Sequence, residues 1–219
     1  MAELIYRNDL ASPADVEGFI MEGEAKVTFP EGRMRLENAL DPALGQAANF
    51  VFWCPAVLPD CIRIEWRFRP LREPGLAMLF FAASGLAGED LFDPALAPRS
   101  GEYGQYTHGD IRTLHLSYFR RRYEDERAFH TCNLRKSRGF HLVAQGADPI
   151  PDVEDCKEFY SLSLTKSGPD VAFAIDGLPI LAWRDDGKSY GPVLGGGRIG
   201  FRQMAPLIAE YSELRVYQL

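Results

Sequence analysis

The sequence predicts an all-β protein in which two antiparallel sheets pack face to face. From Asn49 onward, short segments rich in β-branched and aromatic residues are separated by Gly, Pro and Asp, a pattern typical of successive antiparallel strands. Several segments alternate between apolar and charged residues, which is the period of a strand with one buried face. About ten strands with turn signals between them indicate two packed sheets.

The strand expected at residues 62–69 shows the alternation most clearly. Isoleucine, tryptophan and phenylalanine occupy its even positions, and arginine or glutamate occupies every odd position, so one face is apolar and the other is charged. Further strands are expected at residues 76–83, 111–120, 128–135, 140–144, 159–166, 171–175, 180–184, 198–204 and 212–218.

Turn chemistry and apolar runs complete the outline of the fold. Asp176 and Gly177 can adopt the positive φ angles of a tight hairpin, so the strands on either side of them should pair. The apolar run at 75–88 is too short to cross a bilayer and predicts a strand buried on both faces. Proline interrupts the two short helix candidates, near Glu89 and Glu154. No repeat or linker is visible, so residues 1–219 should form one domain.

Charge and composition exclude several classes of protein. A net charge of -7 and a pI near 5.2 argue against a nucleic-acid binder. The N-terminus lacks the basic start and apolar core of a secretory signal, so we expect a cytoplasmic protein with no membrane partner. The four cysteines lack CxxC spacing and are expected to be free thiols packed as small apolar groups.

Four motifs carry a resemblance to a known family. They are SYFRR at 117–121, CNLRKSRGF at 132–140, ADP at 147–149 and the tail that begins DGLPILAWRDDG at Asp176. Together they resemble the bacterial YesU-like family, a domain of unknown function. The resemblance implies a jelly roll of the galectin-like or concanavalin-A-like lectin/glucanase type and an association with the breakdown of plant cell-wall polysaccharides. It implies no established catalytic residues, and the wider superfamily contains lectins, hydrolases and lyases.

Side-chain parity selects candidate residues on the strand at 128–135. Asn133 and Arg135 share one face, while Cys132 and Leu134 share the other. Cysteine and leucine are the better core residues, so Asn133 and Arg135 should face a ligand. The composition of this segment is similar to the sugar-binding signature of galectins, although the spacing differs.

The preceding strand leaves two alternatives. If Leu114 and Leu116 lie in the core, His115 lines the polar face and is suited to acid or base chemistry. A β-bulge near Tyr118 would instead turn Tyr118 and Arg120 toward that face.

Arginines and aromatic residues extend the candidate site. On strands, Arg67, Arg120 and Arg135 would aim planar guanidinium groups at a carboxylate held on a concave face. The simpler interpretation for the arginines at 120–127 is a solvated hairpin in which they pair with the acidic residues at 124–126. Tyr106 and His108, next to Tyr103, could form an aromatic rim that stacks on sugars.

These residues predict a protein that handles oligosaccharides, most naturally ones containing uronates. In β-elimination, arginine would neutralise the uronate carboxylate and His115 or Tyr118 would remove the adjacent proton. In hydrolysis, Glu65 would be the acid, with no identified partner, since the ExDxE pattern of laminarinase-like hydrolases is absent. Non-catalytic, lectin-like binding is the alternative. We expect no cofactor; calcium at WRDDG or near Glu154 is a weaker alternative without EF-hand spacing. The sequence does not predict the oligomeric state.

Overall fold

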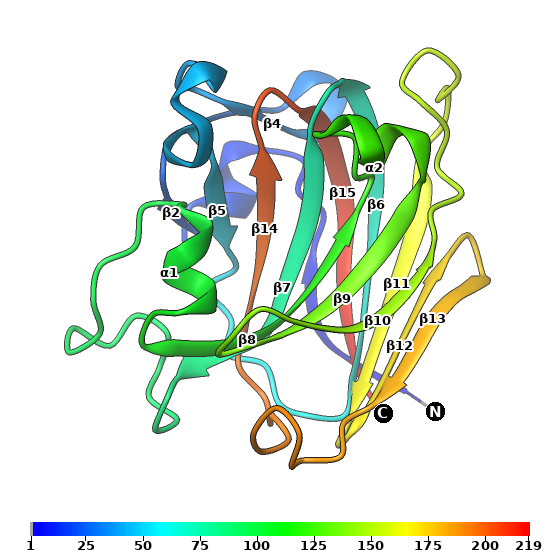
Figure 1. Cartoon of the computed structure of the whole chain (residues 1–219). Helices are drawn as coiled ribbons and strands as arrows, with labels where there is room; N and C mark the ends of the chain where they lie inside the picture. Colours follow the sequence, from blue (N-terminus) through cyan, green and yellow to red (C-terminus); the bar gives the residue numbers. More distant parts are fainter. Residues whose placement is uncertain (1) are drawn as a thin grey trace.

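A computed structural model describes residues 2–219, which form two antiparallel sheets packed face to face (Figure 1). Sheet A has eight strands: β13 (Leu178–Arg184), β12 (Asp170–Ile175), β11 (Tyr160–Ser167), β6 (Ile62–Arg72), β15 (Ile208–Gln218), β4 (Met34–Asn38) and β3 (Ala25–Thr28), in that order, with β1 (Glu3–Asn8) paired to β15. Sheet B has seven: β10 (His141–Ala147), β9 (Thr131–Ser137), β8 (Ile111–Tyr118), β7 (Leu76–Gly85), β14 (Arg198–Met204), β5 (Phe50–Trp53) and β2 (Ile20–Glu22). The predicted two-sheet sandwich is confirmed.

The helical segments are short. They are α1 (Tyr103–Thr107), α2 (Glu124–Ala128) and the 3₁₀ turns η1 (Pro13–Val16), η2 (Pro30–Gly32) and η3 (Pro42–Ala48). Within residues 2–219, no helix is long and apolar enough to cross a bilayer.

The main core lies between the sheets and follows the predicted alternation. On β6, Ile64, Trp66 and Phe68 are buried, while the charged residues between them are partly exposed on the outer face of sheet A. Asp176 and Gly177 have positive φ angles of 49° and 76° and join β12 to β13, as predicted. These features fix which face of each strand is available to a ligand.

Strand β7 is buried on both faces, also as predicted. Leu79 and Phe81 lie in the main core, whereas Met78 and Phe80 belong to a second apolar cluster on the outer face of sheet B. Residues 91–107, including α1, pack against that second cluster.

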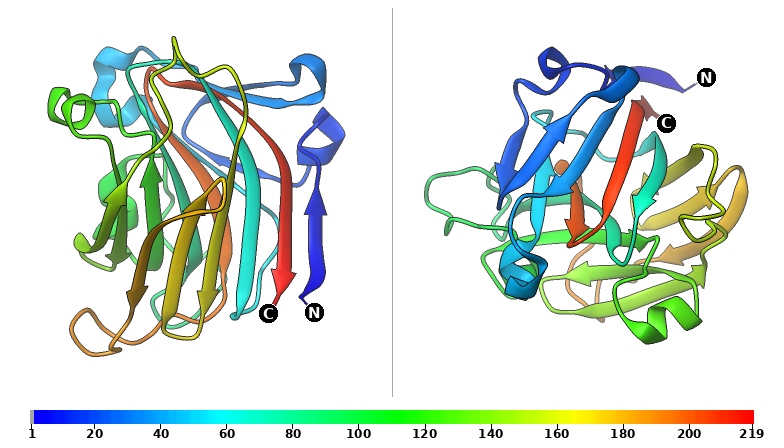
Figure 2. Two further views of the ribbon diagram at one scale, coloured as in Figure 1. Left: turned by 90° about the vertical axis from the view of Figure 1, so that its right-hand side faces the viewer. Right: turned by 90° about the horizontal axis from the view of Figure 1, so that it is seen from above.

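Both sheets curve in the same direction, with the outer face of sheet B on the inside of the curve (Figure 2). We call this outer face of sheet B the concave face. The segment with α1 and the segment with α2 flank it (Figure 1).

Two expectations about secondary structure were wrong. The strand expected at 128–135 begins only at Thr131, because residues 124–128 form α2. Glu126 starts this helix by accepting hydrogen bonds of 3.1 Å from the backbone N–H groups of Arg122 and Tyr123. Strands before residue 62 were not predicted, because β1 to β5 are only three to six residues long and show no extended alternation.

Candidate functional site

Polar side chains of β8 and β9 lie side by side on the concave face. His115 pairs in register with Arg135, and Ser117 pairs with Asn133. The intervening residues, such as Leu116, point into the main core. The predicted faces of His115, Asn133 and Arg135 are therefore confirmed.

Arg135 forms the open part of this site. Its Nη1 donates to the carbonyl oxygen of Phe140 at 3.3 Å, and its Cζ lies 3.8 Å from the centroid of the Phe140 ring. No Asp or Glu within residues 2–219 forms an ion pair with it. Because Phe140 is 49% exposed, the pair presents a cation and an aromatic face to solvent.

Arg120 and Asn133 meet beside it. The Asn133 side-chain amide lies 3.0 Å from Nη1 of Arg120 and 2.7 Å from Nε2 of Gln145. Arg120 also pairs with Glu126 at 2.6 Å. Arg120 thus reaches the concave face without the β-bulge on which that expectation depended, and its charge is balanced by Glu126, as the simpler interpretation predicted.

Arg202, on β14, is a residue that the sequence did not single out. Its side chain is fully buried, and its Cζ lies 4.8 Å from the centroid of the Tyr103 ring. Nη2 donates to Gln46 Oε1 at 3.0 Å and to the Gly101 carbonyl oxygen at 3.2 Å. In the part of the chain that the structure describes, Nε and Nη1 have no hydrogen-bond partner and no carboxylate pairs with this guanidinium. Burial lowers the pKa of Arg202.

His115 is held by two hydroxyl groups. Its Nδ1 lies 2.8 Å from the Tyr103 hydroxyl and its Nε2 lies 3.1 Å from Ser137 Oγ. Burial, followed by the charges of Arg135 and Arg202, lowers the pKa of His115 to about 3. The imidazole is therefore neutral near neutral pH.

Carboxylates are missing from the strands that form this face. Strands β5, β7, β8, β9, β10 and β14 contain no Asp or Glu, and Glu22 on the edge strand β2 is the exception in sheet B. The concave face therefore combines cationic, amide and aromatic groups with few acidic ones.

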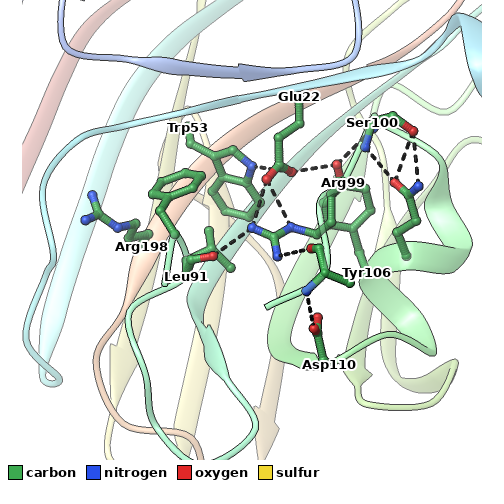
Figure 3. Close-up of polar contacts among 12 residues, drawn as sticks. Glu22, Trp53, Leu91, Arg99, Ser100, Tyr106, Asp110 and Arg198 are labelled. Carbon is green, nitrogen blue, oxygen red and sulfur yellow. Dashed lines mark hydrogen bonds and ion pairs between the residues drawn. The ribbon is translucent and has the colours of Figure 1, made fainter. Parts of the chain in front are cut away.

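Glu22 has a structural role instead (Figure 3). Its carboxylate accepts hydrogen bonds from Trp53 Nε1 at 2.8 Å and from the Tyr106 hydroxyl at 2.7 Å, and it pairs with Arg99 at 2.8 Å. The expectation that Tyr106 stands on an exposed rim was wrong, because its hydroxyl is held by this buried carboxylate. His108 is exposed at the end of α1, with Nδ1 2.8 Å from Thr107 Oγ1.

Glu65 and Arg67 do not join this site. Both lie on β6, which belongs to sheet A, so their side chains point from the opposite side of the sandwich. Glu65 pairs with Arg63 at 2.7 Å, and Arg67 lies 3.7 Å from Glu213 in an open groove of about 700 Å³. The expectation that Arg67 converges with Asn133 was wrong, because sequence alternation does not reveal which sheet a strand enters.

Tyr118 also lies away from the site. The register of β8 against β7 runs without a bulge from Phe81 to Tyr118, so Tyr118 points into the main core with Leu116. Its hydroxyl accepts a hydrogen bond from Trp66 Nε1 at 3.1 Å, and burial raises its pKa well above the usual value. The proposed role of Tyr118 as a base was therefore wrong.

The motifs behind the family resemblance form buried ion pairs. Arg121 of SYFRR is fully buried and pairs with Asp148 of ADP at 3.1 Å. Lys136 of CNLRKSRGF pairs with Asp185 of WRDDG at 2.6 Å and also donates to two backbone carbonyls. The Lys136 ammonium therefore supplies the positive charge beside Asp185, and these motifs have a clear structural role.

Comparison with known proteins establishes the family. The model of a domain of unknown function, DUF1961, matches residues 3–216. The chain belongs to this family. It is 54% identical over 214 residues to the uncharacterized protein YesU of Bacillus subtilis (strain 168), covering 98% of this chain and 95% of YesU.

Solved structures give the fold of this DUF1961 protein. A crystal structure of a Bacillus subtilis protein of unknown function with a galectin-like fold has 53% identity and a TM-score of 0.95, covering 100% of this chain and 98% of that one. The carbohydrate recognition domain of Emp46p has a TM-score of 0.63 at 16% identity, covering 97% and 96%. The predicted jelly roll is thereby confirmed.

Proposed function

We propose that this DUF1961 protein binds uronate-containing oligosaccharides on the concave face. The observation that carries the proposal is the pair Arg135 and Arg202, two guanidinium groups without a counter-ion among residues 2–219. Guanidinium groups bind carboxylates through paired, charge-assisted hydrogen bonds. A uronate carboxylate would bind Arg135 directly and would lie in the positive field of the buried Arg202.

Neighbouring groups suit the rest of a sugar. The exposed side chain of Gln145, which is positioned by the buried Asn133, can exchange hydrogen bonds with hydroxyl groups, and the half-exposed ring of Phe140 offers a face for stacking. The galectin-like fold supports the proposal in a general way, because a structural neighbour is named as a carbohydrate recognition domain.

Within residues 2–219, the concave face lacks the carboxylate groups that hydrolysis of a glycosidic bond commonly needs. Glycosidases commonly use an acid and a second carboxylate on either side of the scissile bond. The strands β7, β8, β9, β10 and β14 supply neither, and Glu65 lies on the opposite side of the sandwich. The proposed function is therefore binding of an acidic oligosaccharide.

Calorimetry with matched sugars tests this function. Purified protein is titrated with oligogalacturonides, oligoalginates and oligoglucuronates, and with neutral oligosaccharides of the same length. Binding of an acidic sugar that is at least tenfold tighter than binding of its neutral counterpart is expected, from about 1.5–3 kcal/mol for a charge-assisted contact.

Two variants locate the binding face. Arg135→Ala should weaken binding of the acidic sugar by about tenfold or more. Arg67→Ala removes a partly exposed arginine from sheet A and should leave binding unchanged. Failure of all three acidic sugars to bind, or equal losses in both variants, would contradict the proposal.

A further inference from the structure

Tyr103 occupies a central position on the concave face. It is the first residue of α1 and is partly exposed. Its ring lies edge-on to His115 at 5.5 Å and to Phe140 at 5.6 Å, and it rests over the guanidinium of Arg202. The Tyr103 side chain thus contacts both the exposed ring of Phe140 and the buried His115.

The hydrogen bonds determine the direction of proton donation. Ser137 Oγ donates to the carbonyl oxygen of Gly139 at 2.9 Å, so it accepts from Nε2–H of His115. Nδ1 of the neutral His115 is then an acceptor, and the Tyr103 hydroxyl donates to it at 2.8 Å. This arrangement leaves the lone pairs of the Tyr103 oxygen without a donor from His115.

The guanidinium groups near this hydroxyl favour its anion, but burial outweighs them and the pKa of Tyr103 lies above its usual value. Burial raises the pKa of Tyr103, and the guanidinium groups of Arg202, Arg135 and Arg120 act in the opposite direction. Arg135 and Arg202 also disfavour a proton on His115. A substrate carboxylate at Arg135 would offset these positive charges, so substrate binding makes His115 a better proton acceptor.

We propose that Tyr103 and His115 form a proton-transfer pair that catalyses β-elimination at a uronate residue, which rests on the proposed binding of acidic oligosaccharides. Tyr103 is the catalytic residue that contacts the substrate. His115 is a positioning residue that accepts and returns the tyrosine proton. Arg135 neutralises the carboxylate, which makes the adjacent C5 proton more acidic.

The reaction is balanced without a co-reactant. The C5–H bond breaks and its proton bonds to the Tyr103 oxygen, while the hydroxyl proton of Tyr103 passes to Nδ1 of His115. The electrons of the C–H bond form the C4–C5 double bond, and the C4–O bond breaks with its electron pair on the departing oxygen. That oxygen takes a proton from Tyr103, which regains one from His115. The products are an unsaturated uronate and a free hydroxyl group.

Product formation and binding are measured together. Each acidic sugar that binds in calorimetry is incubated with the protein, and the conjugated C4–C5 double bond is followed by its ultraviolet absorbance. We expect an absorbing product with wild-type protein. Tyr103→Phe should reduce its rate by about 100-fold or more while the acidic sugar still binds.

Two further variants separate catalysis from structure. Tyr217→Phe removes the hydroxyl of a partly buried tyrosine on sheet A and should leave the rate unchanged. His115→Gln retains a hydrogen-bond acceptor for Tyr103 but cannot take its proton; the rate should fall by at least about tenfold, and the pH profile of the remaining rate should change shape.

The outcomes distinguish the two proposals. A wild-type protein that binds an acidic sugar and forms no unsaturated product overturns the lyase and leaves the binding function standing. Equal rates for wild type and Tyr103→Phe overturn the assignment of Tyr103. A panel of uronate oligosaccharides that does not bind overturns the proposed function, and with it the lyase.

Discussion

Folding stability should fall steeply in mild acid because His115 remains neutral in the folded protein. Its ring is 1% exposed, its Nδ1 accepts a hydrogen bond from Tyr103, and its pKa is lowered to about 3. In the unfolded chain the same group has its ordinary pKa of about 6.5. Below that value the unfolded chain takes up a proton that the folded protein refuses, so stability is lost as pH falls.

The magnitude follows from the two pKa values. Each pH unit between them changes the free energy of unfolding by up to about 1.4 kcal/mol. From about pH 6.5 to about pH 4, His115 alone should therefore remove about 3 kcal/mol of stability. His115→Gln removes this proton uptake from the unfolded chain. It also loses the contact of the imidazole with the Phe80 ring, whose centroids lie 5.3 Å apart, and this loss does not depend on pH.

Urea unfolding measured at several pH values tests this reasoning. The free energy of unfolding of wild type minus that of His115→Gln should shrink by about 3 kcal/mol between about pH 7 and about pH 4. The matched control is His108→Gln, because His108 is exposed and this substitution should leave the pH dependence unaltered. If the free energies of unfolding of wild type and His115→Gln change with pH in parallel, the claim that His115 resists protonation is refuted.

Three other predictions concern the ion pairs and the binding face. Asp148→Asn removes the buried carboxylate that pairs with Arg121 and leaves it the half-exposed Asp152 at 3.1 Å, so it should lower the free energy of unfolding by roughly 2 kcal/mol in chemical denaturation; a change under about 1 kcal/mol would contradict the buried pair. Glu22→Ala should destabilise the protein by a similar amount and alter the fluorescence of Trp53, whose Nε1 loses its acceptor; unchanged fluorescence would argue against that contact. Phe140→Ala should weaken acidic sugar binding by roughly fivefold with little loss of stability, since the ring is 49% exposed, and calorimetry that shows no loss would exclude stacking there.

Local alternation predicted the faces of most strands but not their partners. Cys132 and Leu134 identified the core side of β9, so Asn133 and Arg135 were placed correctly. The same reasoning gave the charged face of β6 but could not say that it lies on the opposite side of the sandwich from Asn133. In a two-sheet protein both outer faces have the same sequence pattern, and only long-range pairing separates them.

Arg202 shows a second limit of prediction from the sequence. Its strand was predicted, yet the segment RIGFRQM has no regular alternation that would mark this arginine as buried. Its burial results from the segment with α1, which folds across sheet B and places Tyr103 on the guanidinium. Such a contact joins positions about 100 residues apart and leaves no local signal.

Some cations of residues 114–140 are buried in ion pairs, whereas Arg135 is not. Arg121 and Lys136 pair with Asp148 and Asp185, which lie 27 and 49 residues further along the chain. These charges hold the loops around sheet B, and they account for part of the basic character of the segment. Arg135 remains without a counter-ion in the described structure, so it is the strand arginine of this segment available to a ligand.

A shortage of acidic residues does not explain these unpaired charges. The chain contains 31 Asp and Glu against 24 Lys and Arg, yet neither Arg135 nor Arg202 has an acidic partner within residues 2–219. An uncompensated buried charge costs several kcal/mol of folding stability. A bound carboxylate would offset part of this cost, so an acidic ligand should stabilise the fold through its charge as well as its contacts. The feature that weakens the free protein is therefore the same one that would select an acidic sugar.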